Sequence, residues 1–311
     1  MKETIVRHGK IKTDVRVPKF LSLREYFYGR DISLADLILH LNENFTFPLI
    51  LKPTDGAGSV EVIRLDDEES AKKELKKIQN SLLSFEVEEF IEGQVIHMNA
   101  LVWNGELRVP ANFRYNIPPL FFDTNHYLGH LEISEPELNK KINTFTQEVV
   151  SRLGIRKGVI HMEAFLLDSG EIVFLEVGLR AGGAFIVDVS EMAMGVNLKD
   201  AGYEIDMNLY SAVEKKLQKA TRSEQGYVFG ALLVPYSSKQ NLRVTSVKMP
   251  SFEKNVMVLS LLPKVGDVLT PGDFYANRGV FFFRGENSSE LMLIKDSIRD
   301  GYKLGVEAIE K

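Results

Sequence analysis

The stretch KGVIHMEAFLLDSGEIVFLEVGL (157–179) decides the fold of this 311-residue chain. Two runs rich in β-branched and aromatic residues flank a turn signal at Asp168-Ser169-Gly170, which predicts a β-hairpin. If Ser169-Gly170 is a two-residue turn, Glu163 falls directly opposite Glu176 on one face of the hairpin. The other face is apolar and is predicted to be core: Ile160, Met162, Ala164, Leu166, Val173, Leu175 and Val177.

Two glutamates that face each other across a hairpin repel and destabilise it. The arrangement is tolerated when a cation lies between them or when one of them is protonated. Carboxylate oxygens without thiolates favour Mg²⁺ or Mn²⁺, and Mg²⁺ usually completes its shell with substrate phosphates. The hairpin alone leaves a second interpretation open, in which Glu163 and Glu176 simply point into water.

The composition excludes several classes of protein. The formal net charge is −5, 44% of the residues are hydrophobic, and the length fits two domains or one compound domain. Without cysteine, disulfides, thiolate metal sites and a cysteine nucleophile are ruled out. A pI near 5.8 argues against a protein that covers nucleic-acid phosphates. No apolar run approaches the ~20 residues of a membrane span, and the start lacks a secretory apolar core, so a cytoplasmic location is expected.

Upstream of the hairpin, the pattern alternates between helix and strand signals. Ser33 precedes LADLILHLNENF, whose apolar residues repeat at helical spacing. FPLILKP, ending at Pro53, predicts a strand that leads into the loop 55–59, and VEVIRL (60–65) predicts a second strand. A charged helix is expected over 67–80, with acidic residues first and lysines last.

The middle of the chain carries two further local signals. SFEVEEFIEG (84–93) predicts an extended segment, and Asn104-Gly105 predicts the turn of a second hairpin. Ser134 with Glu137 three residues later predicts a capping box, which opens a helix ending near Gly154.

The C-terminal third changes character. A helical stretch is expected over about 187–220, followed from Gln225 by short strands with proline and glycine turns. A final helix is expected near 294–309. The change predicts the boundary of a C-terminal lobe.

Lys52 and the glycine-containing loop after it suggest phosphate binding. A lysine that ends a buried strand can place an ammonium group, and the loop its backbone amides, around phosphate oxygens. The loop is not a Walker A sequence, and Glu61 places a negative charge just past it. The alternative is an ordinary hairpin turn with a surface lysine.

The segment VEEFIEG suggests a contact with an adenine base. An extended, half-buried strand can present backbone N–H and C=O groups to an adenine edge, here from Glu89 and Ile91, with Phe90 packing nearby. Taken alone, the segment fits a plain β-strand better.

The order of these elements resembles the ATP-grasp superfamily and, within it, the L-amino-acid ligase-like branch. The sequence of FPLILKP, DGAGS, VEEFIEG, HMEAF and FLEVGLRAGG carries the resemblance, and RYNIPPLFFDTNHYLGH and GDVLTPGDFYANRGVFFFRGENSSE add to it. It implies an α+β fold in which a small lid (46–92) closes over ATP on a larger antiparallel-sheet subdomain (93–222). Residues 1–45 would be a remnant leading into this fold, and 223–311 a C-terminal lobe.

The resemblance also implies the roles of individual residues. Lys52 matches a lysine that contacts nucleotide phosphates, and the flexible phosphate lid is matched by Gly56, Gly58 and Ser59. The adenine-contacting strand is matched by Glu88, Glu89 and Ile91, and either Glu92 or Gln94 would contact the ribose. Glu163 and Glu176 match two magnesium ligands, and Arg180 matches an arginine near the acyl-phosphate, where its fork can grip developing charge.

Several positions depart from the family pattern. Val60 and Glu61 replace a basic residue and a glycine, and Val95 replaces an acidic ribose contact. Gly178 stands where a third metal ligand, commonly asparagine, is usual; His161, opposite it in the predicted register, either compensates near the metal or packs against Phe165 or the lid. The usual N-terminal domain is missing and is expected to be truncated or encoded separately.

The resemblance implies an ATP-dependent carboxylate–amine ligase that uses ATP with Mg²⁺ or Mn²⁺. A substrate carboxylate would attack the γ-phosphate, and an amine would then attack the acyl-phosphate. A carboxylase or carbamoyl-phosphate-type enzyme and a nucleotide-binding module without turnover remain as alternatives. The expected partners are small molecules and a possible second copy or N-terminal subunit, without nucleic acid or membrane.

Overall fold

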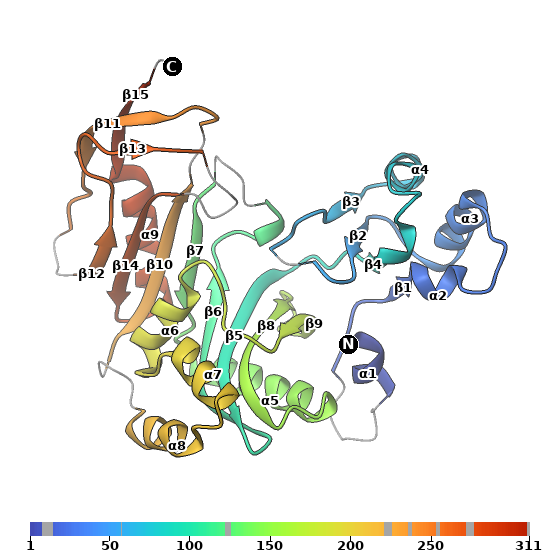
Figure 1. Cartoon of the computed structure of the whole chain (residues 1–311), viewed down its shortest axis with the longest axis horizontal. Coiled ribbons are helices and arrows are strands. Elements are labelled where there is room, and N and C mark those ends of the chain that lie inside the picture. Colours follow the sequence, from blue (N-terminus) through green and yellow to red (C-terminus); the bar gives the residue numbers. More distant parts are fainter. Residues whose placement is uncertain are drawn as a thin grey trace. The chain divides into compact units, whose positions relative to one another are not determined.

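The computed structural model describes residues 1–7, 15–56, 58–121, 126–220, 226–235, 238–252, 256–271 and 277–309 (Figure 1). The chain divides into two compact units. The small unit consists of Arg16–Gly93 and Leu167–Phe174, and the large unit consists of Met1–Val15, Gln94–Leu166 and Leu175–Lys311.

The small unit is built on a four-stranded antiparallel sheet with the order β1-β4-β2-β3. The strands are β1 (Phe20–Ser22), β2 (Leu49–Pro53), β3 (Ile63–Leu65) and β4 (Phe85–Glu89). Its helical segments are α2 (Leu23–Phe27), α3 (Leu34–Asn44), α4 (Glu68–Lys77) and the 3₁₀ turn η1 (Leu82–Ser84).

Helices cover one face of this sheet. Helix α3 begins with a capping box between Ser33 and Asp36, and its leucines join a core with Leu49 and Leu51 of β2. The predicted helix and strand are thus confirmed. The strand residues between the buried ones point to the other face, because side chains alternate along a strand. That face carries Lys52.

The small unit differs from the predicted lid in two respects. It begins at Arg16 instead of residue 46, because β1, α2 and α3 contribute to the same core. The second predicted strand is shorter than 60–65, since Ser59 and Glu61 adopt the left-handed conformation with φ of 59° and 58°. Left-handed residues lack the extended backbone of a regular β-strand.

The large unit contains an eight-stranded sheet with the order β12-β14-β10-β7-β6-β5-β8-β9 (Figure 1). Its strands are β5 (Gln94–Trp103), β6 (Glu106–Tyr115), β7 (Leu128–Glu132), β8 (Lys157–Leu166), β9 (Ile172–Gly178), β10 (Val228–Pro235), β12 (Met257–Leu261) and β14 (Asn277–Gly285). The hairpin predicted at Asn104-Gly105 is confirmed, with Trp103 paired to Glu106 and left-handed φ values of 56° and 83° in the turn.

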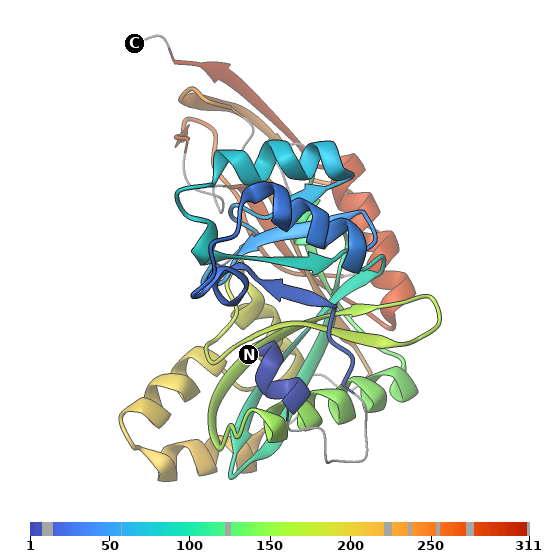
Figure 2. The ribbon, with the colours of Figure 1, turned by 90° about the vertical axis from the view of Figure 1, so that its right-hand side faces the viewer.

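Two layers of helices cover this sheet. On one face lie α6 (Ile186–Met194), α7 (Leu198–Asp206) and α8 (Tyr210–Lys219), which share a core with Phe113 and Phe282. On the opposite face lies α9 (Ser288–Gly301), which packs with Leu131 and Phe283 (Figure 2). Helix α5 (Pro136–Arg152) covers β6 on the side of α9, where α1 (Lys2–Arg7) joins it through an Arg152 hydrogen bond to the Ile5 carbonyl at 3.1 Å.

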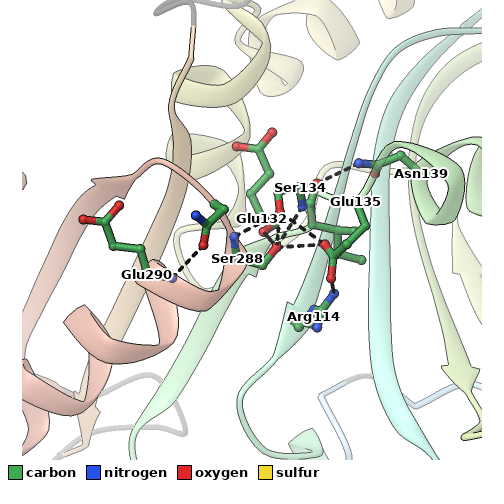
Figure 3. Close-up of polar contacts among 9 residues, drawn as sticks. Arg114, Glu132, Ser134, Glu135, Asn139, Ser288 and Glu290 are labelled. Carbon is green, nitrogen blue, oxygen red and sulfur yellow. Dashed lines mark hydrogen bonds and ion pairs between the residues drawn. The ribbon is translucent and has the colours of Figure 1, made fainter.

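Helix α5 confirms the helix predicted after Ser134, but the capping box is wrong. The N-cap residue is Glu135, and it makes no side-chain cap hydrogen bond. Ser134 instead exchanges hydrogen bonds with Ser288 at the start of α9: each backbone N–H donates to the other hydroxyl, at 2.8 and 3.0 Å (Figure 3). The Ser288 hydroxyl also contacts Glu135, which Arg114 pairs at 2.8 Å. This clamp holds α9 against the junction of β7 and α5.

The C-terminal region corrects the prediction of a final helix over 294–309. Helix α9 ends at Gly301, and β15 (Lys303–Ala308) follows it. Together with β11 (Leu242–Lys248) and β13 (Val268–Leu269), β15 forms a three-stranded sheet in the order β13-β11-β15. Tyr302 separates α9 from β15: it is 3% exposed and its hydroxyl donates to the Arg278 carbonyl.

The chain after Gln225 also belongs to the large unit, since β10, β12 and β14 extend the eight-stranded sheet. None of the helices in the described ranges is long and apolar enough to cross a membrane.

Candidate functional site

Lys52 lies near the end of β2, on the face of the small sheet opposite the helices. Its Nζ atom is 2.9 Å from Glu88 and 3.7 Å from Glu86, both on the neighbouring strand β4. The Lys52 side chain is 12% exposed, so the two carboxylates hold the ammonium group in a defined, partly buried position. The structure thus brings together two predicted site residues, Lys52 and Glu88, as an ion pair.

The predicted phosphate lid forms a turn with three left-handed residues. Gly58, Ser59 and Glu61 have φ of 65°, 59° and 58°. Glycine adopts this conformation without steric cost, whereas a residue with a Cβ atom pays roughly 1–2 kcal/mol. Backbone strain of this kind is common at ligand-binding and switch segments, and the lid role of Gly56, Gly58 and Ser59 stays a prediction. Ala57 lies outside the described residues.

The backbone role predicted for Glu89 is corrected. Its N–H group donates to the Lys19 carbonyl at 2.8 Å, because β4 is an interior strand, so this group is not available to an adenine edge. The Glu89 carboxylate pairs with Arg16 at 3.2 Å. Ile91, directly after β4, is 6% exposed. Glu92, three residues after the end of β4, is exposed.

The turn of the decisive hairpin is not the predicted two-residue turn. Gly170 N–H donates to the Leu167 carbonyl at 2.8 Å, and Leu167 N–H donates to the Glu171 carbonyl at 2.9 Å. Three residues, 168–170, therefore form the loop, and the predicted opposition of Asp168 and Glu171 is wrong.

The change of turn removes the basis for placing Glu176 directly opposite Glu163. Leu175, assigned from the sequence to the apolar face, packs with Phe165 against the same core cluster, on the Glu163 side of β8. Glu163 and Glu176 nevertheless both belong to the large unit and are both partly buried. Their shared role at a metal stays a prediction.

Glu163 is a largely buried carboxylate, 12% exposed, with defined partners. Its Oε1 atom accepts a hydrogen bond from the Tyr115 hydroxyl at 2.7 Å and lies 3.3 Å from Nε2 of His161. Burial by itself raises the pKa of Glu163, but the hydrogen bonds and charge of His161, with the Tyr115 hydroxyl, outweigh it and hold the pKa below the usual value. The carboxylate is therefore ionised at neutral pH and suited to a cation.

A row of buried side chains continues from Glu163 across the sheet. Nδ1 of His161 is 2.8 Å from Oδ1 of Asn99, and the Asn99 amide nitrogen is 2.9 Å from Nδ1 of His97. Nε2 of His97 is 3.1 Å from Nδ1 of His130, whose Nε2 lies 3.0 Å from the Ala184 carbonyl. The row thus joins Glu163 to the loop after Arg180.

Four residues at this site were not predicted from the sequence: Tyr115, Asn99, His97 and His130. One signal was present: His97 and Asn99 occupy alternate positions of VIHMNALVW, which places two polar groups on one face of an apolar strand. The histidine side chains do not converge on one point. Within the described ranges, no group of three or more histidine, aspartate or glutamate side chains is arranged to hold a metal ion.

Arg180 lies in the loop after β9 and is exposed. Its guanidinium donates to the Ala181 carbonyl at 3.0 Å. The side chain folds back over Gly178, where an added Cβ atom would lie 3.2 Å from its Cγ. The aliphatic part of the Arg180 side chain therefore lies beside Gly178, the position at which an asparagine was expected from the resemblance.

Two cavities in the large unit lie away from the predicted site residues. One of about 130 Å³ is bordered by Val109, Met194 and Ala220, and one of about 270 Å³ by Asn112, Asn139 and Asn143. Glu132 borders both cavities.

Gln94, the other residue predicted to contact the ribose, is the first residue of β5 and is exposed.

Comparisons with known proteins define the class. Residues 45–188 match the ATP-grasp domain family. The chain therefore contains an ATP-grasp domain, which confirms the family inferred from the order of motifs.

Two curated proteins are similar in sequence to this chain, and their names are more specific than that of the domain family. The chain is 26% identical over 186 residues to an L-arginine-specific L-amino acid ligase of Bacillus subtilis, covering 57% of this chain and 44% of that protein. It is 25% identical over 237 residues to the alanine–anticapsin ligase of Bacillus subtilis strain 168, covering 68% and 49%. The chain thus spans about half the length of the curated relatives it matches, and both are amino-acid ligases.

Solved structures agree on the fold. An L-amino acid ligase from Bacillus licheniformis superposes with a TM-score of 0.66 at 18% identity, covering 97% of this chain and 70% of that one. A biotin carboxylase from Campylobacter jejuni superposes with a TM-score of 0.63 at 13% identity, covering 99% and 66%. At these identities the likeness shows the ATP-grasp fold alone, and it confirms the predicted α+β class.

Proposed function

We propose that the protein is an ATP-dependent carboxylate–amine ligase that forms an amide through an acyl-phosphate and releases ADP and phosphate. The ATP-grasp domain and the ligase relatives support the reaction class. The observation that carries the proposal is Glu163: a buried, ionised carboxylate, fixed on one oxygen by Tyr115 and His161. A buried anion of this kind suits a cation that a phosphate shares.

The donor set fits Mg²⁺ or Mn²⁺. Glu163 and Glu176 supply hard carboxylate oxygens, and the chain has no cysteine to favour a softer metal. Among the described residues, no contact is made by Oε2 of Glu163, so this oxygen is open to an ion. When bound, such an ion neutralises charge on the phosphate oxygens of ATP.

The nucleotide contacts are proposed from residues in the small unit and at its end. Lys52 would contact phosphates, with Gly56, Gly58 and Ser59 as the lid. Glu88 is proposed to orient Lys52, since it pairs with that ammonium group at 2.9 Å. For the base and ribose the proposed contacts are Glu89 through groups other than its N–H, Ile91, and either Glu92 or Gln94.

Arg180 is proposed as the catalytic residue. It is exposed, always charged, and folded over Gly178 in the loop after β9. A planar guanidinium can grip the substrate carboxylate and then the acyl-phosphate through two parallel hydrogen bonds. Catalysis would come mostly from positioning and charge neutralisation, as in phosphoryl transfer generally.

The proposed substrates are an amino acid as the carboxylate and a second amino acid or amine as the nucleophile. The names of both curated relatives favour this class. A nucleotide-binding module without turnover is the second candidate, favoured by Val60, Glu61 and Gly178 in place of the family's residues.

The test is ADP release by the purified chain with ATP and Mg²⁺, over pooled amino acids, with mass detection of products. We expect ADP release that depends on the pool, a product mass equal to two components minus water, and loss of both in Glu163→Gln. ATP binding without ADP release in any pool would favour the binding module. A carboxylated or carbamoylated product in the same assay with bicarbonate added would identify the carboxylase-type alternative.

A further inference from the structure

A polar cavity of about 270 Å³ in the large unit has no role in the proposed reaction. It lies between β6 and the start of α5, and its border includes Asn112 of β6 with Asn139 and Asn143 of α5. The Asn112 side chain lies on the opposite face of the sheet from Tyr115, because the two residues are three apart on one strand. The cavity is therefore separate from the hydrogen bond between Tyr115 and Glu163.

The hydrogen bonds among the three asparagines determine the orientation of their amide groups. Nδ2 of Asn139 lies 2.7 Å from the Ile133 carbonyl, which can only accept, so Oδ1 of Asn139 faces Asn112. Asn112 must therefore present its NH₂ group, which donates to Oδ1 of Asn139 at 2.8 Å and to Oδ1 of Asn143 at 2.9 Å. Both N–H groups of the Asn112 side chain are then used.

This arrangement leaves the other end of the Asn112 amide without a partner. Its Oδ1 atom is buried and accepts no hydrogen bond from any described residue, and the whole residue is 4% exposed. A buried acceptor without a donor is costly, and folded proteins normally satisfy such a group with another protein group, a water molecule or a ligand. Because Asn112 borders the cavity, a molecule inside the cavity can supply the donor.

The charge around the cavity favours a cationic donor. Glu132 also borders the cavity and is 3% exposed, and its Oε2 atom accepts from the Phe229 N–H at 2.9 Å. Among the described residues on the border, none is lysine, arginine or histidine. The start of α5, at Pro136, opposes a cation, but a helix N-terminus carries only about half a positive charge against the unit negative charge of an ionised carboxylate. The net sign is therefore negative.

The size and lining of the cavity favour an organic molecule over a metal ion. A water molecule takes up about 30 Å³ in the liquid, so a cavity of about 270 Å³ is larger than one water molecule or one ion fills. Within the described ranges, no cluster of three acidic or histidine side chains is arranged to hold a metal ion there. Pro110 and Ala111 provide carbon surface for a short alkyl group.

We propose that this cavity binds a small organic molecule through a primary ammonium group, which donates a hydrogen bond to Oδ1 of Asn112 and is balanced by the negative charge of Glu132. The alkyl part of the molecule lies against Pro110 and Ala111. None of these residues has a part in the proposed binding of ATP or metal. The site can therefore be tested without ATP or metal, and its failure would leave the proposed function unaffected.

The first experiment is NMR of the full chain with ¹⁵N-labelled asparagine, titrated with ethylammonium chloride without ATP or metal. Single asparagine variants assign the side-chain NH₂ signals. We expect a saturable shift of the Asn112 signal, because a hydrogen bond to Oδ1 polarises the whole amide group. The absence of a saturable shift up to about 100 mM, a concentration at which even a millimolar site is filled, would overturn the proposal and leave the cavity to water.

Three other probes separate the possible sources of recognition. Ethanol has a similar size without the charge, the potassium ion has the charge without N–H donors, and acetate has the opposite charge. At matched ionic strength, we expect each of them to bind more weakly than ethylammonium, as judged from the shift of the Asn112 signal. An affinity for any of the three equal to or higher than that for ethylammonium would overturn the assignment of a primary ammonium group.

Two variants with the same change of charge locate the site. Glu132→Gln keeps an acceptor for the Phe229 N–H and removes the charge at the cavity, so ethylammonium affinity should fall at least about tenfold. Glu137→Gln is the matched control, because Glu137 is exposed in the first turn of α5 and does not border the cavity; its affinity should stay within about twofold of wild type.

Equal ethylammonium affinity of wild type and a folded Glu132→Gln variant would contradict the proposal, as would an equal loss in both glutamine variants. Asn112→Ala keeps the test decisive if Glu132→Gln does not fold. It removes the unpaired Oδ1 atom, so ethylammonium binding, followed through the remaining asparagine signals, should be lost. Wild-type affinity in Asn112→Ala would overturn the proposal.

Discussion

At the scale of the residue, the predicted chemistry depends on side chains whose surroundings the sequence does not reveal. Lys52 and Glu163 were found because a lysine at a strand end and a glutamate in a hairpin carry local signals. Their partners were not found, because Glu88 reaches Lys52, and Tyr115 reaches Glu163, across strands that are distant in sequence. Cross-strand pairing of this kind depends on register, which the sequence specifies only indirectly.

Lys52 is expected to contribute to stability as well as to nucleotide binding. Lys52→Ala leaves the buried Glu88 carboxylate without its ammonium partner, which should cost about 1–3 kcal/mol in the free energy of unfolding. Urea denaturation measures this cost, and calorimetry measures ATP affinity, which should fall. The control is Lys52→Ala with Glu88→Gln, in which stability should recover in part and ATP affinity should not. Normal ATP affinity in Lys52→Ala would remove its phosphate role.

Arg180 is expected to matter for turnover and not for folding. Arg180→Lys keeps the charge but not the planar fork, so kcat should fall roughly 100-fold. The residue is exposed, so the free energy of unfolding should change by less than about 0.5 kcal/mol. Near-normal kcat in this variant would exclude Arg180 from the reaction.

The buried histidines predict a specific acid sensitivity. The pKa of His130 falls from its unfolded value near 6.5 to about 4 on folding. A depressed folded pKa gives stability that is present above about pH 6.5 and is lost as the pH falls toward 4, because the unfolded chain binds the proton first. The loss amounts to about 3 kcal/mol for this residue.

Urea denaturation at pH 7.5 and pH 4.5 measures the effect. Wild type should lose more stability between these pH values than His130→Gln, which cannot titrate. His40, which is in α3 of the small unit, provides the control: His40→Gln should follow the wild-type profile. Parallel profiles for wild type and His130→Gln would contradict the buried neutral histidine.

At the scale of the element, local signals predicted most helices and hairpins, and long-range contacts decided the rest. Asn104-Gly105 specified its turn because both positions need left-handed backbone. The capping box at Ser134 failed because Ser288, more than 150 residues away in sequence, takes the Ser134 hydroxyl. Residues 303–308 form a strand because they pair with the edge of β11. The local sequence pattern does not reveal this long-range pairing.

The clamp between Ser134 and Ser288 should stabilise the large unit. Ser288→Ala removes the hydroxyl that accepts from Ser134 N–H and leaves that partly buried group without its acceptor, so the free energy of unfolding should fall by about 1–3 kcal/mol. Ser297→Ala on the exposed side of the same helix should change it by less than about 0.5 kcal/mol. Equal effects of the two variants in urea denaturation would show that the clamp does not hold α9.

At the scale of the whole molecule, the order of motifs predicted the ATP-grasp domain although no single motif was decisive. The eight-stranded sheet explains the limit of that prediction: β10, β12 and β14 come from the C-terminal third yet extend the sheet that contains β5 and β8. A change in composition at Gln225 therefore marked no separate compact unit. Contacts between distant segments define such units, and composition does not report them.

The central claim is that Glu163 and Glu176 bind the metal that accompanies ATP. The most direct measurement is calorimetry of ATP binding to the purified chain with and without Mg²⁺, for wild type, Glu163→Gln and Glu176→Gln. We predict that Mg²⁺ strengthens ATP binding in wild type. In each variant, the increase in ATP affinity caused by Mg²⁺ should be at least about tenfold smaller, with the fold retained. Equal ATP binding with and without Mg²⁺ in wild type, or a full Mg²⁺ effect in both variants, would contradict it.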